Sequence, residues 1–189
     1  DQHGLAEQFR RSGRNALFIV PEAPARKSQQ VHWRDLGQLI GEVRRHLGLR
    51  RPWGPVVAVG HSGAYRTLLS WLTYPPLEHV IILDGLYGHE QPFHEWLEQA
   101  RGQPNRLTIV AIDTLRWSEM LARDIGYTRA LDWVPDDLSD DRQAIDDGMR
   151  TSRFVYIRSQ HGHMELVTEG TTIPALLQMT RLSAVAGEG

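Results

Sequence analysis

Short runs of apolar residues recur along the chain and are separated by stretches with helical periodicity. The runs are apolar at successive positions rather than at alternate ones, which is typical of strands covered on both faces. They are residues 15–20 (NALFIV), 55–60 (PVVAVG), 79–85 (HVIILDG), 106–113 (RLTIVAID) and 153–159 (RFVYIRS). This pattern predicts an α/β fold in which a mainly parallel sheet has helices on both faces, a three-layer sandwich.

The intervening stretches place apolar residues three or four positions apart, which indicates amphipathic helices. We expect helices at 5–11, 30–48, from about Gly63 onward, and at 92–101, 115–124, 139–149 and 172–183. A chain of 189 residues suits one domain with a single sizeable core. We therefore predict a single domain over residues 1–189. Because the first residue is Asp1 rather than Met, we expect an N-terminally truncated or processed chain.

The composition excludes several function classes. The formal net charge is -2 and the basic residues form no stripe, so nucleic acid is not an expected partner. No apolar stretch approaches the roughly 20 residues that a membrane span needs. There is no cysteine, which excludes cysteine nucleophiles and thiolate metal sites but leaves the compartment open. The acidic stretch 135–148 lacks the spacing of a calcium loop, so no metal site is expected there.

One serine stands at a point where a strand gives way to a helix. Ser62 follows the run VVAVGH, and the helical stretch begins immediately after it. A sharp turn of this kind crowds the residues two before and two after the serine, and these are the small residues Gly60 and Ala64. The N–H of Gly63 lies at the beginning of the helix, where it can donate to an oxyanion. The local pattern therefore predicts an exposed, nucleophilic serine.

This stretch resembles the nucleophile elbow of the α/β-hydrolase superfamily, with Gly60-His61-Ser62-Gly63-Ala64 in place of Gly-x-Ser-x-Gly. The resemblance implies a Ser-His-acid catalytic triad, with the acid and then the histidine following the serine in the chain. Asp84 and Asp113 each end a later strand and are both candidates for the acid. We favour Asp84, and Asp113 is the alternative.

Two histidines follow the last predicted strand. The family histidine commonly stands in a Gly-His-Met-like context, which matches Gly162-His163-Met164. The resemblance therefore favours His163 as the base, with His161 as the alternative. His61 is too close in sequence to swing over Ser62, so we expect it to support the elbow by hydrogen bonding within the loops.

The family draws a second oxyanion donor from a loop that often begins His-Gly and follows an early strand. His3-Gly4 matches that dipeptide, but no strand precedes it, so the chain resembles the family only from its first helix onward. An N-terminal segment or a second chain is therefore expected to complete the sheet.

Insertions that follow the Asp84 strand form lids in many relatives, and residues 86–102 are a candidate lid. Tyr87, Phe93 and Trp96 are candidates to line a substrate pocket. The alternative is that Phe93 and Trp96 simply pack a helix onto the sheet.

These features predict a cofactor-independent serine hydrolase acting on a small-molecule or polymeric acyl substrate. A carboxylic ester is favoured because its cleavage makes the least demand on the leaving group. An amidase or peptidase with the same residues is one alternative, and a non-catalytic hydrolase-like binding module is another. A nucleotide-binding protein is disfavoured because GHSGAY lacks the lysine of a phosphate-binding loop.

Overall fold

The computed structural model describes residues 3–24, 28–50, 54–99, 105–126, 128–134 and 145–186. In this part of the chain, five strands form one sheet in the order β1-β2-β3-β5-β4, and all neighbouring pairs are parallel. The strands are β1 (Val56–His61), β2 (Leu77–Leu83), β3 (Arg106–Ala111), β4 (Arg129–Leu131) and β5 (Phe154–Arg158). The predicted parallel sheet is confirmed.

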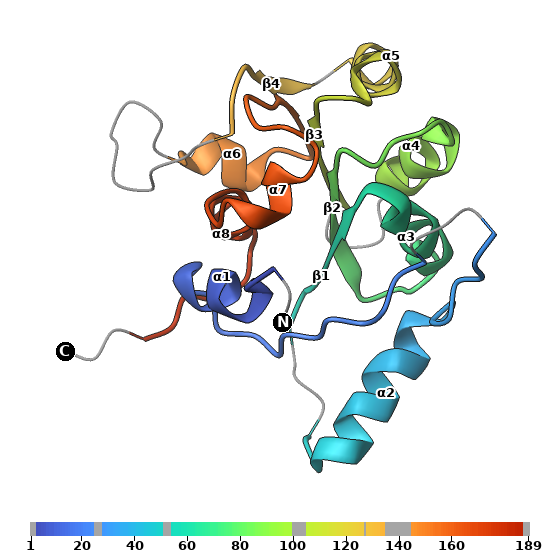
Figure 1. Cartoon of the computed structure of the whole chain (residues 1–189), viewed down its shortest axis with the longest axis vertical. Helices are drawn as coiled ribbons and strands as arrows, with labels where there is room; N and C mark the ends of the chain where they lie inside the picture. Colours follow the sequence, from blue (N-terminus) through green and yellow to red (C-terminus); the bar gives the residue numbers. More distant parts are fainter. Residues whose placement is uncertain are drawn as a thin grey trace.

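Helices lie on both faces of this sheet (Figure 1). The described helices are α1 (Leu5–Arg11), α2 (Leu36–Leu47), a 3₁₀ turn (Ser62–Ala64), α3 (Tyr65–Trp71), α4 (Glu90–Glu98), α5 (Leu115–Ile125), α6 (Asp147–Thr151), α7 (Glu165–Thr168) and α8 (Thr172–Gln178). Figure 1 shows α3 and α4 on one side of the sheet and α1, α6, α7 and α8 on the other. The three-layer architecture follows the prediction. No described helix is both long and apolar enough to span a bilayer.

Two hydrophobic clusters fill the two sides of the sheet. Successive residues of each strand alternate between them: Val80 and Ile82 of β2 belong to the cluster under α2 to α5, whereas Ile81 and Leu83 belong to the one under α7 and α8. All four are at most 1% exposed. A strand with both faces buried must be apolar at every position, which is why the run HVIIL lacks the alternation of a half-exposed sheet.

The prediction of a strand at 15–20 is wrong. These residues are extended but join no sheet, and the nearest pairing is an isolated bridge between Arg14 and Ala184. Phe18 stacks on Phe9 of α1, with ring centroids 4.6 Å apart, and Val20 is 57% exposed. A strand needs a neighbour that is hydrogen-bonded along its length, and among the described residues only Asn15, at the start of this run, makes such a bond, from its N–H to the carbonyl oxygen of Ser183 at 2.8 Å.

Helix boundaries differ from the predicted ones where local capping decides them. The helix expected at 30–48 begins at Leu36, because the side chain of Asp35 accepts a hydrogen bond from the N–H of Gln38. The helix expected at 172–183 ends at Gln178. Of the helix expected at 139–149, residues 139–144 lie outside the described residues, and α6 begins only after Asp146.

A buried arginine lies at the N-terminal end of β3, the central strand of the sheet. Arg106 is 1% exposed, and its guanidinium donates to the carbonyl oxygens of Met149, Ser152 and Met179 at 2.9–3.1 Å. Burial and the charge of Arg181 lower the pKa of Arg106 to about 10. The charge is retained at neutral pH and is satisfied by backbone acceptors, so it ties β3 to the segments around α6 and α8.

Candidate functional site

Ser62 and Asp84 occupy equivalent positions at the carboxyl ends of two neighbouring strands. His61, the last residue of β1, pairs with Leu83, the last residue of β2, so the two candidates follow directly after a matched pair. Both have left-handed backbones, with φ 52° at Ser62 and φ 43° at Asp84. Among the described non-glycine residues, only His89 shares this conformation. Strained backbones of this kind concentrate at functional sites, which supports a functional reading of this edge.

Small residues make the sharp turn at Ser62 sterically feasible. A Cβ added at Gly60 would lie 2.7 Å from a methyl carbon of Leu68 and 3.4 Å from the Cβ of Ala64. A Cβ added at Gly85 would lie 2.7 Å from the carbonyl oxygen of Ser62 and 3.3 Å from its nitrogen. Gly60 and Gly85 therefore allow β1, α3 and the end of β2 to approach closely around the serine.

The carboxylate of Asp84 is fully buried and fully engaged. Its Oδ1 accepts hydrogen bonds from the N–H of Ile112 at 3.0 Å, the N–H of Thr114 at 2.9 Å and the hydroxyl of Thr114 at 2.8 Å. Its Oδ2 lies 2.6 Å from Nδ1 of His163. Burial by itself would raise the pKa of Asp84, but the hydrogen bonds from His163, Ile112 and Thr114 outweigh it and leave the pKa below its usual value. Asp84 is therefore ionised at neutral pH.

This carboxylate fixes the tautomer of His163. An ionised carboxylate can only accept, so Nδ1 of His163 carries the hydrogen and donates it to Asp84. In the neutral ring, Nε2 is then left with a free lone pair, which is the form that a general base requires. The carboxylate and the imidazole come from positions 79 residues apart in sequence, and the sheet edge brings them together.

The histidine beside the serine holds the loop that carries His163. Nε2 of His61 lies 2.9 Å from the carbonyl oxygen of His163 and donates to it, and the two rings have centroids 4.5 Å apart. Burial lowers the pKa of His61, so its ring is neutral at pH 7. The expected supporting role of His61 therefore has a direct contact behind it. Among the described hydrogen bonds there is none between Oγ of Ser62 and Nε2 of His163.

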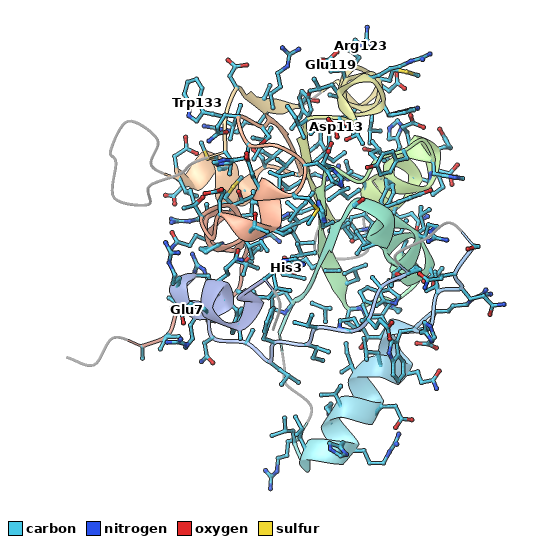
Figure 2. All side chains as sticks on the ribbon, viewed as in Figure 1. His3, Glu7, Asp113, Glu119, Arg123 and Trp133 are labelled. Carbon is cyan, nitrogen blue, oxygen red and sulfur yellow. The ribbon has the colours of Figure 1, made fainter. Side chains whose placement is uncertain are left out.

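The alternative acid Asp113 lies at the edge of the same site, and the alternative base His161 makes a different contact. Asp113 is exposed and lies beside β3 and α5 (Figure 2), and one of its carboxylate oxygens falls within 4.8 Å of donor atoms of both Asp84 and His163. Such a group of three could in principle hold a cation, but both oxygens of Asp84 already accept hydrogen bonds. His161 is half-buried, and its N–H donates to Oγ of Ser159 at 2.9 Å.

Gly63, the candidate oxyanion donor, lies within the 3₁₀ turn that leads into α3. No described hydrogen bond engages its N–H. A Cβ added at Gly63 would lie 3.2 Å from the carbonyl oxygen of Pro24, so the segment before α2 passes close to the turn. The N–H of Gly63 is therefore available to donate to an oxyanion, and the backbone of Pro24 lies close to the same turn.

Aromatic residues of α3, of α5 and of the segment between β2 and α4 lie close to one another. Tyr87, which is 38% exposed, lies 5.9 Å from Tyr65 and 6.2 Å from Trp117 between ring centroids, and Tyr65 lies 6.0 Å from His89. The role of Tyr87 as a pocket residue stays a prediction.

Phe93 and Trp96 do not join this aromatic group. They are 0% and 4% exposed and pack α4 onto the sheet, in agreement with the packing alternative.

Sequence reasoning missed Ile112 and Thr114, which supply all three hydrogen bonds to Oδ1 of Asp84, and the contact of Gly85 with Ser62. The one available signal was the polar Asp-Thr pair directly after a buried strand.

Three comparisons with known proteins were negative: no protein-family model matches the chain, and no curated protein or solved structure is significantly similar to it.

Proposed function

We propose that the protein is a serine hydrolase that cleaves a carboxylic ester through a covalent acyl-enzyme. One observation carries the proposal: a buried, ionised Asp84 holds Nδ1 of His163 at 2.6 Å, and the ring of His163 contacts His61, the residue that precedes Ser62 on its strained turn. A structural histidine needs no such arrangement. The combination of an oriented imidazole and a serine at a sharp strand-to-helix turn is the requirement of nucleophilic catalysis.

In the proposed reaction, Oγ of Ser62 attacks the ester carbonyl while Nε2 of His163 accepts its proton. The N–H of Gly63 donates to the oxyanion of the tetrahedral intermediate, and Asp84 stabilises the imidazolium. His163 then returns the proton to the leaving alcohol. A water molecule, activated by the same imidazole, attacks the acyl-enzyme and releases the acid, and Ser62 regains its proton.

A movement of the His163 side chain or of Ser62 must close the contact that is absent in this structure. Catalytic hydrogen bonds are often long before the substrate binds and shorten in the complex. In this proposal Tyr87, on the segment that follows Asp84, and its aromatic neighbours would contact the acyl or alcohol group.

The resemblance of the elbow to that of α/β-hydrolases agrees with this proposal. An amide or peptide substrate would use the same residues and differs only in its leaving group. The second candidate is a non-catalytic binding module with a hydrolase-like fold. The missing Ser62–His163 hydrogen bond is the observation that favours it.

Labelling with a fluorophosphonate separates the two candidates, because the probe reacts only with an activated serine. We expect one label per chain, located at Ser62 by peptide mass spectrometry. Ser62→Ala should abolish labelling. Ser70→Ala is the matched control, because Ser70 lies on α3 and its hydroxyl only donates to the carbonyl of Thr67. A folded wild-type protein that takes no label would favour the binding module.

A further inference from the structure

Three aromatic side chains follow three neighbouring strands at the carboxyl edge of the sheet. Tyr65 begins α3 after β1, Tyr87 lies on the segment after β2, and Trp117 lies in the first turn of α5, after β3. These strands are parallel and adjacent in this order. The rings contact one another in the same order, with centroids 5.9 Å apart for Tyr65 and Tyr87 and 6.2 Å apart for Tyr87 and Trp117. The three residues therefore form an aromatic row along the edge that carries Ser62 and Asp84.

Backbone contacts hold this row close to the turn that carries the serine. The N–H of Tyr65 donates to the carbonyl oxygen of Ser62. On the next strand, the N–H of Tyr87 donates to the carbonyl oxygen of Gly85 at 3.1 Å. Gly85 is itself so close to the serine that a Cβ added there would lie 2.7 Å from the carbonyl oxygen of Ser62. The row therefore has a fixed position relative to the candidate nucleophile.

The row is supported by the core on one side and faces solvent on the other. Leu86, which directly precedes Tyr87, is 0% exposed, and Trp117 packs partly against the same hydrophobic cluster. Tyr87 itself is 38% exposed. Tyrosine and tryptophan provide a large, rigid contact area at a low cost in side-chain entropy. An exposed row of such rings, anchored in the core beside a reactive group, is suited to binding part of a substrate.

Backbone strain at one end of the row is a second sign of function. His89 has φ 62° and, with Ser62 and Asp84, is one of three described non-glycine residues with a left-handed backbone. The ring of His89 stacks on that of Tyr65, with centroids 6.0 Å apart and an angle of 29° between the planes. The other two strained residues belong to the candidate site. Because such strain concentrates at functional sites, the surface on which His89 stacks is assigned to the same site.

The geometry of the rings indicates what kind of group they would bind. Aromatic pairs attract each other in tilted or offset arrangements with centroids about 4.5–7 Å apart. Both contacts of the row lie in this range and are tilted, by 56° and 62°. A further aromatic ring placed against Tyr87 would gain this attraction in addition to the burial of its surface. A saturated ring would gain only the burial, so the row favours an aromatic group over an aliphatic one.

We propose that the aromatic row binds an aromatic ring of the substrate, so that the esters cleaved by this protein carry such a ring on their acyl or alcohol side. The inference rests on the hydrolase activity proposed above and names the substrate class of that site.

The test compares esters that differ only in the saturation of their ring. Methyl hydrocinnamate and methyl cyclohexanepropanoate carry the ring on the acyl side, and phenethyl acetate and cyclohexylethyl acetate carry it on the alcohol side. Acid release in a pH-stat gives kcat/KM, which is divided by the rate constant of hydroxide-catalysed hydrolysis. Burial alone would favour the saturated ring, which is larger. We expect a preference of about threefold to tenfold for the aromatic member of one pair, and that pair identifies the side on which the ring lies.

Three variants locate the preference. Tyr87→Leu removes the ring and should make the two members of the pair equal substrates, whereas Tyr87→Phe keeps the ring and should retain the preference. Trp133→Leu is the matched control, because Trp133 is 46% exposed and follows β4, which lies at the opposite end of the sheet from β1. The preference should persist in this control.

Binding to the Ser62→Ala protein, measured by ligand-observed NMR titration of the same esters, separates this inference from the hydrolase proposal. Acylation of Ser62 in the wild-type protein with equal rates within both pairs, or a preference that survives Tyr87→Leu, would overturn the inference alone. Tighter binding of the aromatic esters without hydrolysis by the wild-type protein would overturn the hydrolase proposal and support the row as a site for aromatic rings. Neither hydrolysis nor a preference in binding would overturn both.

Discussion

Replacing Asp84 by Asn tests how the candidate site is oriented. The Asn carbonyl can take the place of Oδ1 and still accept from Ile112 and Thr114, so the side chain stays in position. Its NH₂ group then faces Nδ1 of His163, which must become an acceptor. The hydrogen moves to Nε2, and the imidazole can no longer take the proton of Ser62. We expect kcat for ester hydrolysis to fall about 10⁴-fold at neutral pH, equivalent to about 5 kcal/mol of barrier.

Stability gives the second readout of this variant. The variant exchanges charge-assisted hydrogen bonds for neutral ones, which should lower the free energy of unfolding by about 1–3 kcal/mol. Hydrolysis of p-nitrophenyl acetate and urea denaturation measure the two effects separately. Asp124→Asn is the matched control, because Asp124 is an exposed residue of α5 and should change kcat less than threefold. Full activity in the Asp84 variant, or a 10⁴-fold loss when the alternative acid is replaced in Asp113→Asn, would refute this assignment.

Three further substitutions, the first with a control variant, test other parts of the structure. Gly85→Ala places a methyl group 2.7 Å from the carbonyl oxygen of Ser62, so kcat should fall at least tenfold, whereas Gly41→Ala on the open face of α2 should raise stability by about 0.5–1 kcal/mol. Arg106→Met leaves three carbonyl oxygens without donors and should lower the unfolding free energy by about 3 kcal/mol, seen as a lower urea midpoint. Burial, with the charge of Arg106, holds the pKa of His79 well below 6.5, so the unfolded chain takes up a proton first. Stability should therefore decline as pH falls below 6.5, by up to about 1.4 kcal/mol per pH unit from this residue, and His79→Gln should remove that part of the slope in urea titrations at several pH values.

The sheet was predictable because its strands are apolar at successive positions, as strands buried on both faces must be. Val80 to Leu83 are apolar at every position, and the fold buries both faces of β2. The same signal failed at 15–20, because an apolar run becomes a strand only where a neighbouring strand accepts its hydrogen bonds. The same signal gave no prediction of β4, because its three residues Arg-Ala-Leu do not form an apolar run. They form a strand by pairing with the edge of β5.

The candidate reactive residues of the site could be predicted from the sequence, whereas the contacts that support them could not. Ser62 and Asp84 directly follow β1 and β2, His163 lies in the loop after β5, and parallel strands bring their carboxyl ends to one edge. The support of Asp84 by Thr114 was not predictable, since it depends on how the turn after β3 folds back over β2. Likewise, the left-handed backbone of Asp84 follows from tertiary packing rather than from its residue type.

Trapping the acyl-enzyme tests the central claim most directly. The protein is mixed with p-nitrophenyl acetate, quenched in acid within one turnover and digested for peptide mass spectrometry. The account predicts one acetyl group on Ser62 of the wild-type protein, and no acetyl group at that peptide in Ser62→Ala. An ester that is hydrolysed without acetylation of Ser62, or with the acetyl group on another residue, would contradict the account.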